Sequence, residues 1–206
     1  ECFVYICTIQ NTCPLQILSV LENIDDVFYQ VCTFTNVASS AEEGKLTLDV
    51  IQLRDCEFDN IELNDTIFQK PIFNNSQPSR VEVETLQIHD CIIEDSFTIN
   101  NFHVDHFDIR NTVVKRNFEL EKSDINDFAV NNSQFEGLVN CYNNNFEVFH
   151  VSKSTFEEFV GFEYCEFDRY KKGTCATFEY STFLSFINLR NTSFFLGIDI
   201  SNTHLK

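Results

Sequence analysis

Apolar residues return every twenty-one positions through the middle of the chain. The segment FDIRNTVVKRNFELEKSDIND, residues 107–127, aligns without a gap on the next twenty-one residues, and four such rows begin at Leu86, Phe107, Phe128 and Phe149. Positions 1, 3, 6, 8, 12, 14, 17 and 19 of each row are apolar or small, with Asn144 the only strongly polar exception. In the first row these positions read Leu86, Ile88, Cys91, Ile93, Phe97, Ile99, Phe102 and Val104. The regularity predicts a repeat architecture.

The spacing of these positions indicates strands. Within a pair the two inward residues are two positions apart, which is typical of a short strand with one face toward a core. A helix would need apolar residues at i, i+3, i+4 and i+7, and the rows do not supply them. Four two-residue strides per lap predict a chain that coils, with successive laps stacked about 4.8 Å apart through parallel hydrogen bonds. The prediction is a β-solenoid with about 21 residues and four short strands per coil.

The upstream segment has a tighter period of five. Its inward pairs are Leu46/Leu48, Ile51/Leu53, Cys56/Phe58, Ile61/Leu63, Thr66/Phe68 and Pro71/Phe73. This pattern resembles the pentapeptide-repeat family, and the resemblance, which covers residues 46–205, implies a right-handed four-sided β-helix. The alternation of F-x-I with S-x-F is equally similar to the broader right-handed parallel β-helices of the pectin-lyase type. Both resemblances imply an all-β, right-handed parallel β-helix.

We expect one domain over residues 1–206, with irregular N-terminal coils at 1–45 and regular coils at 46–205. Polar segments at 38–44, 74–80 and 170–174 interrupt the pattern and are predicted to be loops.

Charge excludes several partners. The formal net charge is −18 and the pI is near 4.4, which argues against direct binding to nucleic acid or to anionic membranes. No apolar run approaches the roughly eighteen residues that span a bilayer, so no membrane insertion is expected. The chain begins at Glu1 and contains no Met, which favours a processed product or a fragment.

Nine cysteines raise the alternatives of metal, catalysis or disulfides. No C-x-x-C occurs, and the histidines lack zinc-finger spacing, so no metal site is predicted. Four cysteines fall on inward positions, where a thiol behaves as a small apolar side chain: Cys56, Cys91, Cys141 and Cys165. In an oxidising compartment the candidates for disulfides are Cys2, Cys7, Cys13, Cys32, Cys165 and Cys175, with the pairing left open.

Four N-x-S/T sequons begin at Asn64, Asn74, Asn131 and Asn191. The first three follow directly after the second inward residue of a pair, where a side chain leaves the coil. Together with the cysteines, they favour a secreted or cell-surface protein that carries covalent N-glycans.

Signals for catalysis are weak. His103 and His106 lie three residues apart with Asp105 and Asp108 nearby, an arrangement that could form a metal or acid–base cluster. Scattered polar residues on the outside of a solenoid explain the same pattern. Recognised phosphate-loop, hydrolase and metalloprotease motifs are absent from the sequence. We therefore predict no catalytic, cofactor or metal site, and no enzyme.

Three function classes remain. The first is a structural protein: the inward pattern runs through Ile198/Ile200 and Thr203/Leu205 to the end of the chain, and a solenoid with apolar ends needs caps. Copies that cover one another's ends would form an extracellular fibre by homopolymerisation, unless the chain is a piece of a longer solenoid. The second class, implied by the pentapeptide resemblance, is an acidic DNA mimic that inhibits a topoisomerase. The third is a carbohydrate-binding or carbohydrate-active β-helix, which glycan binding or sugar release would identify.

Overall fold

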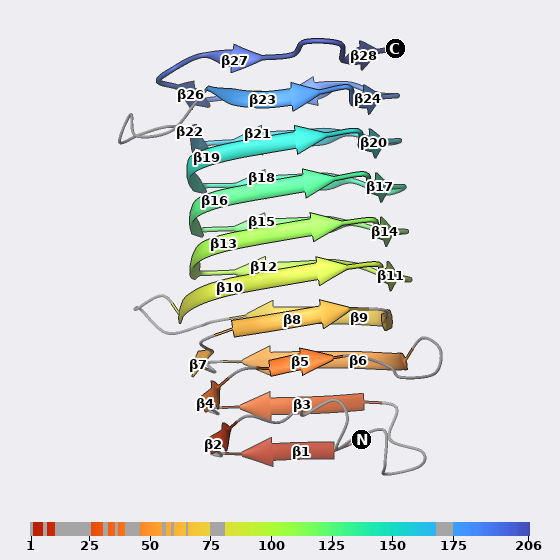
Figure 1. The fold of residues 1–206 in the computed structure, drawn as a ribbon, viewed down its shortest axis with the longest axis vertical. Helices are drawn as coiled ribbons and strands as arrows, with labels where there is room; N and C mark the ends of the chain where they lie inside the picture. Colours follow the sequence, from red (N-terminus) through yellow and green to blue (C-terminus); the bar gives the residue numbers. More distant parts are fainter. Residues whose placement is uncertain are drawn as a thin grey trace.

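The structure is a computed structural model of the 206-residue chain. It describes residues 81–167 and 175–206 in full, together with Phe73 and Asn74; before these it describes strands β1 to β9 through their backbone. Every element in the described residues is a strand, and the strands pair in parallel as a β-solenoid of about six turns (Figure 1). The predicted all-β solenoid with about 21 residues per coil is confirmed.

The strands lie on three faces. The long face carries β10 (Val81–His89), β13 (Phe102–Arg110), β16 (Asp124–Asn131) and β19 (Asn145–Ser152), continued by β22 (Glu166–Phe167), β23 (Ala176–Glu179), β26 (Ser193–Phe194) and β27 (Ile198–Asp199). The short face carries β11 (Ile92–Ile93), β14 (Val113–Val114), β17 (Gln134–Phe135), β20 (Thr155–Phe156), β24 (Thr182–Phe183) and β28 (His204–Leu205). The rear face carries β12 (Phe97–Asn100), β15 (Phe118–Glu121), β18 (Val139–Tyr142), β21 (Val160–Glu163) and β25 (Ile187–Asn188).

Earlier coils use the same parallel pairing. Their strands are β1 (Cys2–Tyr5), β2 (Thr8–Gln10), β3 (Asp26–Gln30), β4 (Thr33–Thr35), β5 (Val37–Ser39), β6 (Leu46–Arg54), β7 (Glu57–Phe58), β8 (Asn60–Asn64) and β9 (Thr66–Asn74). Strand β9 is shared, because its first half pairs with β11 of the short face and its second half with β12 of the rear face.

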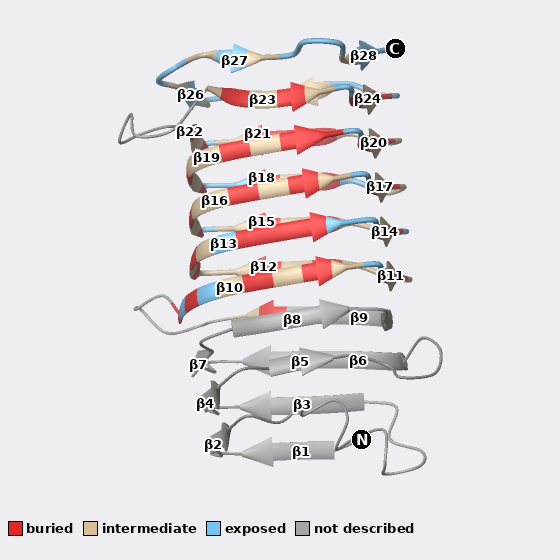
Figure 2. Cartoon of the chain, in the orientation of Figure 1, coloured by how far each residue is buried: buried red, intermediate tan, exposed pale blue. Residues whose placement is uncertain are grey.

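The register places the repeat columns on top of one another as predicted. Leu86 pairs with Phe107, Phe107 with Phe128, and Phe128 with Phe149. All eight inward positions of the four rows are buried, including the polar ones. Phenylalanine dominates this core: the rings of Phe135 and Phe156 stack with centroids 5.0 Å apart. Figure 2 shows buried residues in red along β10, β13, β16, β19 and β23.

The predicted four short strands per coil are wrong, because each regular coil has three. The pairs at positions 17/19 and 1/3 lie on one continuous strand, as Phe102, Val104, Phe107 and Ile109 do on β13. The coil is therefore three-sided.

Backbone conformation explains which junctions turn. Three of the gaps between inward pairs in each row hold two residues, and two of these three gaps contain a residue with φ between 49° and 65°, where the chain turns. In these rows and the coils that follow, these residues are Asp90, Asn101, Asn111, Lys122, Asn132, Asn143, Lys153, Tyr164, Tyr180, Asn191 and Asn202. Asn and Asp tolerate this left-handed region better than most residues. The gap between Ile93 and Phe97 is one residue longer and bends at Asp95. The gap between Val104 and Phe107 has no left-handed residue, so the strand continues through it.

Lap length varies along the chain. Leu46 pairs with Thr66, twenty residues on, whereas Val151 pairs with Phe178, twenty-seven residues on. Of the predicted loop at 74–80, Asn74 belongs to β9 instead and residues 75–80 lie outside the described residues, as does the predicted loop at 170–174. Of the predicted loop at 38–44, the first two residues belong to β5 instead.

Candidate functional site

The outer side of the long face gathers four of the five histidines. His89 lies on β10, His103 and His106 on β13, and His150 on β19. The tightest contacts surround Asp108, whose Oδ2 lies 3.2 Å from His89 Nε2 and 2.6 Å from an Arg110 guanidinium nitrogen. The Asp108 side chain is only 13% exposed, so this carboxylate is partly desolvated between its two partners.

The histidine and aspartate residues of the predicted cluster do not converge. His103 lies 3.7 Å from Glu82 and 3.6 Å from Asp105, whereas His106 faces Asp127 at 3.5 Å. Asp108 belongs to the His89 and Arg110 contact instead. Within residues 81–167 and 175–206 no group of three or more His, Cys, Asp or Glu side chains could hold a metal ion. Although His103, Asp105, His106 and Asp108 share strand β13, their partners are divided between this strand and its neighbours: His103 also meets Glu82 on β10, His106 meets Asp127 on β16, and Asp108 meets His89 on β10.

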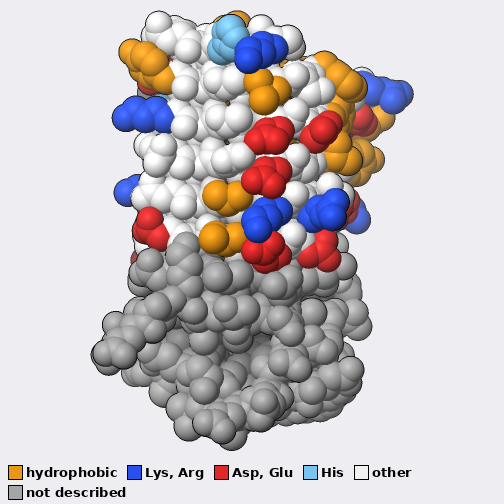
Figure 3. All heavy atoms as spheres, turned by 90° about the vertical axis from the view of Figure 1, so that its right-hand side faces the viewer, with side chains coloured by type: hydrophobic (Ala, Val, Ile, Leu, Met, Phe, Trp, Pro, Cys, Tyr) orange, Lys and Arg blue, Asp and Glu red, His pale blue; other side chains and the backbone are white. Residues whose placement is uncertain are grey.

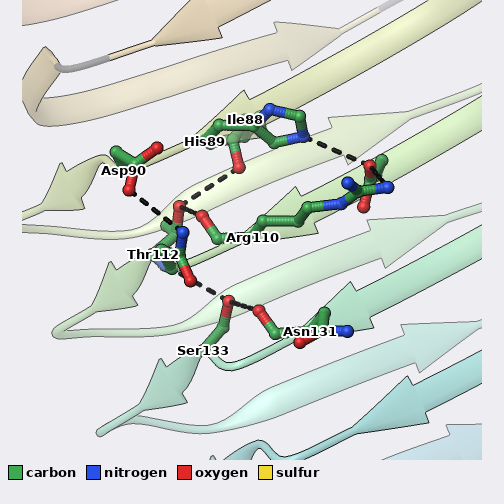
Figure 4. A network of polar contacts seen from close by, with 9 residues as sticks. Ile88, His89, Asp90, Arg110, Thr112, Asn131 and Ser133 are labelled. Carbon is green, nitrogen blue, oxygen red and sulfur yellow. Dashed lines mark hydrogen bonds and ion pairs between the residues drawn. The ribbon is translucent and has the colours of Figure 1, made fainter.

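A polar ladder runs inside the corner next to this face. The backbone N of Thr112 donates to Ser133 Oγ at 3.2 Å, and the backbone N of Ser133 donates to Ser154 Oγ at the same distance. Each hydroxyl in turn donates to the carbonyl two residues earlier, as Ser133 does to Asn131. Figure 4 shows the ladder residues Thr112 and Ser133 next to His89 and Arg110. The ladder pairs backbone groups that the turn would otherwise leave buried without partners, and its role is structural.

Asn144 occupies the other inner corner. Its Oδ1 accepts from the backbone N of Ser123 at 2.9 Å, and its Nδ2 donates to the Leu120 carbonyl at 2.7 Å. The residue is fully buried. The polar exception in the inward pattern is thus a ladder residue.

Four described cysteines carry thiols that are not in a disulfide: Cys91, Cys141, Cys165 and Cys175. Cys165 is fully buried and donates to the Cys141 carbonyl at 3.3 Å, so it is not bridged to Cys175 in this structure. Burial raises the pKa of Cys165 to about 11, although hydrogen bonds from Asn144 act in the opposite direction. Burial, with the neighbouring Cys165 second, also raises the pKa of Cys141 well above its usual value. Both thiols are therefore poor nucleophiles.

The side chains of the other disulfide candidates lie outside the described residues. Cys2 begins β1, and its side chain is outside the described residues. Cys7, Cys13 and Cys32 also lie outside the described residues.

The sequon asparagines occupy different environments. Asn64 ends β8, and its side chain lies outside the described residues. Asn74 ends β9, where its Oδ1 accepts from Asn100 Nδ2 at 3.0 Å. Asn131 ends β16 and is half-buried, whereas Asn191 is exposed at a turn. Of the three described side chains, Asn191 is the most open to modification.

Two apolar surfaces stand out on the described residues. The last coil exposes side chains in inward columns, namely Leu189, Ile198, Ile200 and Leu205. A second surface lies on the corner between the short and rear faces, where Leu138 and Phe186 are exposed. The sequence interpretation found the first and missed the second. The sequence does carry a signal for this second surface. Position 11 is polar in the first two rows, at Ser96 and Asn117, and apolar in the next two, at Leu138 and Phe159.

Comparison with known proteins returns no match: no protein-family model, no curated protein and no solved structure matches the chain. The structure shows that the fold is a β-solenoid, but no family model identifies the chain as a pentapeptide-repeat protein. Among the described residues no helix is long and apolar enough to cross a membrane.

Proposed function

We propose that the protein is a non-enzymatic structural β-solenoid that stacks end to end into an extracellular fibre. The observation that carries this proposal is the open surface of the last coil. Ile198, Ile200 and Leu205 are 42%, 50% and 56% exposed. One coil below, the residues in the same three columns are buried: Ala176 under Ile198, Phe178 under Ile200 and Phe183 under Leu205. A further coil stacked on this surface would bury the three side chains in the same way.

Strand edges support the same contact. Strands β25, β26, β27 and β28 lie at the ends of their sheets, so their outer backbone groups have no strand partner in the described residues. Such edges accept another parallel strand through main-chain hydrogen bonds. Figure 2 shows the uppermost coil in pale blue above the red core of the coil below.

A second copy is the occupant that fits both features. At the other end of the molecule, β1 pairs with β3 along one edge, and we propose that the next copy binds along the other. Strand β1 belongs to the same sheet as β25 and β28, so a head-to-tail contact would continue the parallel pairing of this sheet. A contact between two different ends does not close and propagates as a filament. The five-residue period of residues 46–73, with its twenty-residue lap, supports a relationship to pentapeptide-repeat solenoids for that segment.

Sedimentation and negative-stain electron microscopy of the full chain test the end contact. We expect concentration-dependent filaments for the native sequence and a monomer for Ile200→Asn/Leu205→Asn. Tyr180→Asn is the matched control, because Tyr180 is 61% exposed on the side of the coil at a position where other coils carry Asn. This control should polymerise normally. A monodisperse native monomer, or filaments unaffected by the double substitution, would contradict the proposal.

The compartment requires a separate measurement. We propose a secreted or cell-surface protein with N-glycans at one or more of Asn64, Asn74, Asn131 and Asn191. Its acidic sides would keep neighbouring fibres apart through like-charge repulsion. Intact mass of native material before and after deglycosylation and reduction tests the glycans and disulfides together. A native mass equal to that of the bare chain would exclude the glycans.

A further inference from the structure

An apolar ridge crosses three coils at the corner between the short and rear faces. It consists of Leu138, Phe159 and Phe186, which we call the corner ridge. They occupy the same place in successive coils: the backbone N of Val139 donates to the Phe159 carbonyl, and that of Val160 to the Phe186 carbonyl. The rings of Phe159 and Phe186 lie 4.9 Å apart. Phe186 is 68% exposed, which makes it the most exposed large apolar side chain of the described residues.

A glycine shapes the ridge. A Cβ at Gly161 would come within 2.9 Å of Phe159 Cε1, so the ring lies over this outward position of β21. The equivalent outward positions of neighbouring strands carry side chains, Glu119 on β15 and Asn140 on β18. Only a residue without a side chain leaves room for the ring to rest on the sheet. The Phe159 ring is therefore seated on the rear face, while Leu138 and Phe186 on either side of it are exposed.

Charge changes along the same corner. In the lower coils, Lys115 Nζ pairs with Glu94 at 2.7 Å, and Arg116 adds a second cation. Beside the ridge the corresponding positions are Glu136, Glu157 and Glu158. Across residues 81–167 and 175–206 no ion pair reaches these three carboxylates. Figure 3 shows this side of the molecule, with two blue side chains at the centre, red ones both below and above them, and orange ones along the right-hand edge.

We propose that the corner ridge and its three glutamates form a docking surface for a basic, apolar segment of another protein. Apolar side chains of the partner would cover Leu138, Phe159 and Phe186. Its Lys or Arg side chains would reach Glu136, Glu157 and Glu158. Charge complementarity selects this occupant. A second copy of this chain carries a net charge of −18, so its flank would be repelled, and nucleic acid or an anionic membrane would be repelled for the same reason.

Fluorescence anisotropy with a labelled synthetic peptide tests the proposal. The probe alternates lysine and leucine (KLKLKLK), and a lysine–serine peptide (KSKSKSK) tests whether charge alone suffices. The protein is the full chain carrying Ile200→Asn/Leu205→Asn, so the result does not depend on end-to-end association. We expect the lysine–leucine peptide to bind at least tenfold more tightly than the lysine–serine peptide.

Variants locate the binding surface. Phe186→Ser should weaken binding at least tenfold, and Glu157→Gln/Glu158→Gln should weaken it and reduce its dependence on salt. The matched controls are Tyr180→Ser, an exposed aromatic elsewhere, and Glu119→Gln/Glu121→Gln, two carboxylates of β15; both should stay within twofold of the parent. Equal binding of the two peptides, or equal losses in the control variants, would overturn the proposal. Lateral association of the parent protein that Phe186→Ser abolishes, with unchanged peptide binding, would assign the ridge to a second copy and overturn it too.

Discussion

The side-chain oxygen of Asn144 accepts a hydrogen bond from the backbone N of Ser123, one coil below, at 2.9 Å. The two residues occupy the same column of the repeat, so a side chain here replaces a strand-to-strand backbone contact at a turn. The Asn144 amide also donates to the Leu120 carbonyl, which pairs a second buried backbone group.

Asn144→Leu should therefore destabilise the protein in spite of its better apolar match to the column. It leaves two buried backbone groups unpaired, each costing roughly 1–3 kcal/mol. Urea unfolding followed by circular dichroism measures the loss. Asn144→Ser is the control and should lose less, because a hydroxyl serves this column at Ser123. A neutral or stabilising Asn144→Leu would show that the turn does not depend on the ladder.

Phe135→Ala should cost roughly 3–5 kcal/mol, as truncation of a buried aromatic does. The Phe135 ring is 1% exposed and stacks on Phe156, with Phe118 at 5.7 Å on its other side. Phe186→Ala, on the exposed ridge, should change the unfolding free energy by less than about 1 kcal/mol. Similar losses in both variants would mean that the stacked column is no more important than the surface.

Gly137→Ala should destabilise the coil by about 1–3 kcal/mol, because overpacking forces the backbone to move. A Cβ at this position would lie 2.5 Å from the carbonyl carbon and oxygen of Arg116 in the coil below. Glu158→Ala changes the equivalent position one coil higher, which already accommodates a Cβ, and should be nearly neutral. Thermal unfolding of the two variants compares them directly, and equal midpoints would contradict the clash.

Asn132→Val should destabilise the turn after β16 by about 1–2 kcal/mol, because Asn132 has φ 50° and a β-branched residue resists that conformation. The substitution also removes the hydrogen bond from Asn132 Nδ2 to Asn111 Oδ1 at 2.9 Å. Lys153→Asn, at the same turn one coil higher with φ 51°, should be neutral or stabilising. Unfolding free energies in urea give the comparison, and a stable Asn132→Val would show that the corner adapts.

Stability should fall as the pH rises from about 9 toward 11. Burial raises the pKa of Cys165 from 9.0 to about 11, so below pH 9 the thiol is protonated whether the chain is folded or unfolded. Above pH 9 the unfolded chain loses this proton while the folded chain keeps it. Each such thiol therefore lowers the free energy of unfolding by about 1.4 kcal/mol for every pH unit in this range. Urea unfolding at pH 8 and pH 10 measures the slope. Cys165→Ser should decline less steeply, and an equal slope would exclude the Cys165 thiol as a source.

The amino-acid sequence was enough to predict which residues face inward. Because like positions stack on like in a parallel coil, a column of Phe, Ile and Val such as that of Ile109 and Val130 is buried wherever further coils are stacked on both sides of it. The period of twenty-one therefore specified the core, the lap length and the position of Asn144 in a buried column. It also predicted the apolar last coil, since Ile198 and Leu205 continue these columns.

The number of sides of the coil and the partners of outward residues became clear from the folded structure. The hydrophobic pattern shows equal gaps after Ile88 and after Val104, yet the chain turns only after Ile88, where Asp90 adopts positive φ. Outward side chains meet neighbours one coil away, so the pairing of His89 with Asp108 depends on register, which residue order along one strand does not show. The corner ridge likewise depends on which outward side chains the turns bring together and how much solvent reaches them. Burial follows from a repeating pattern, whereas corners and surface contacts follow from backbone conformation at single residues.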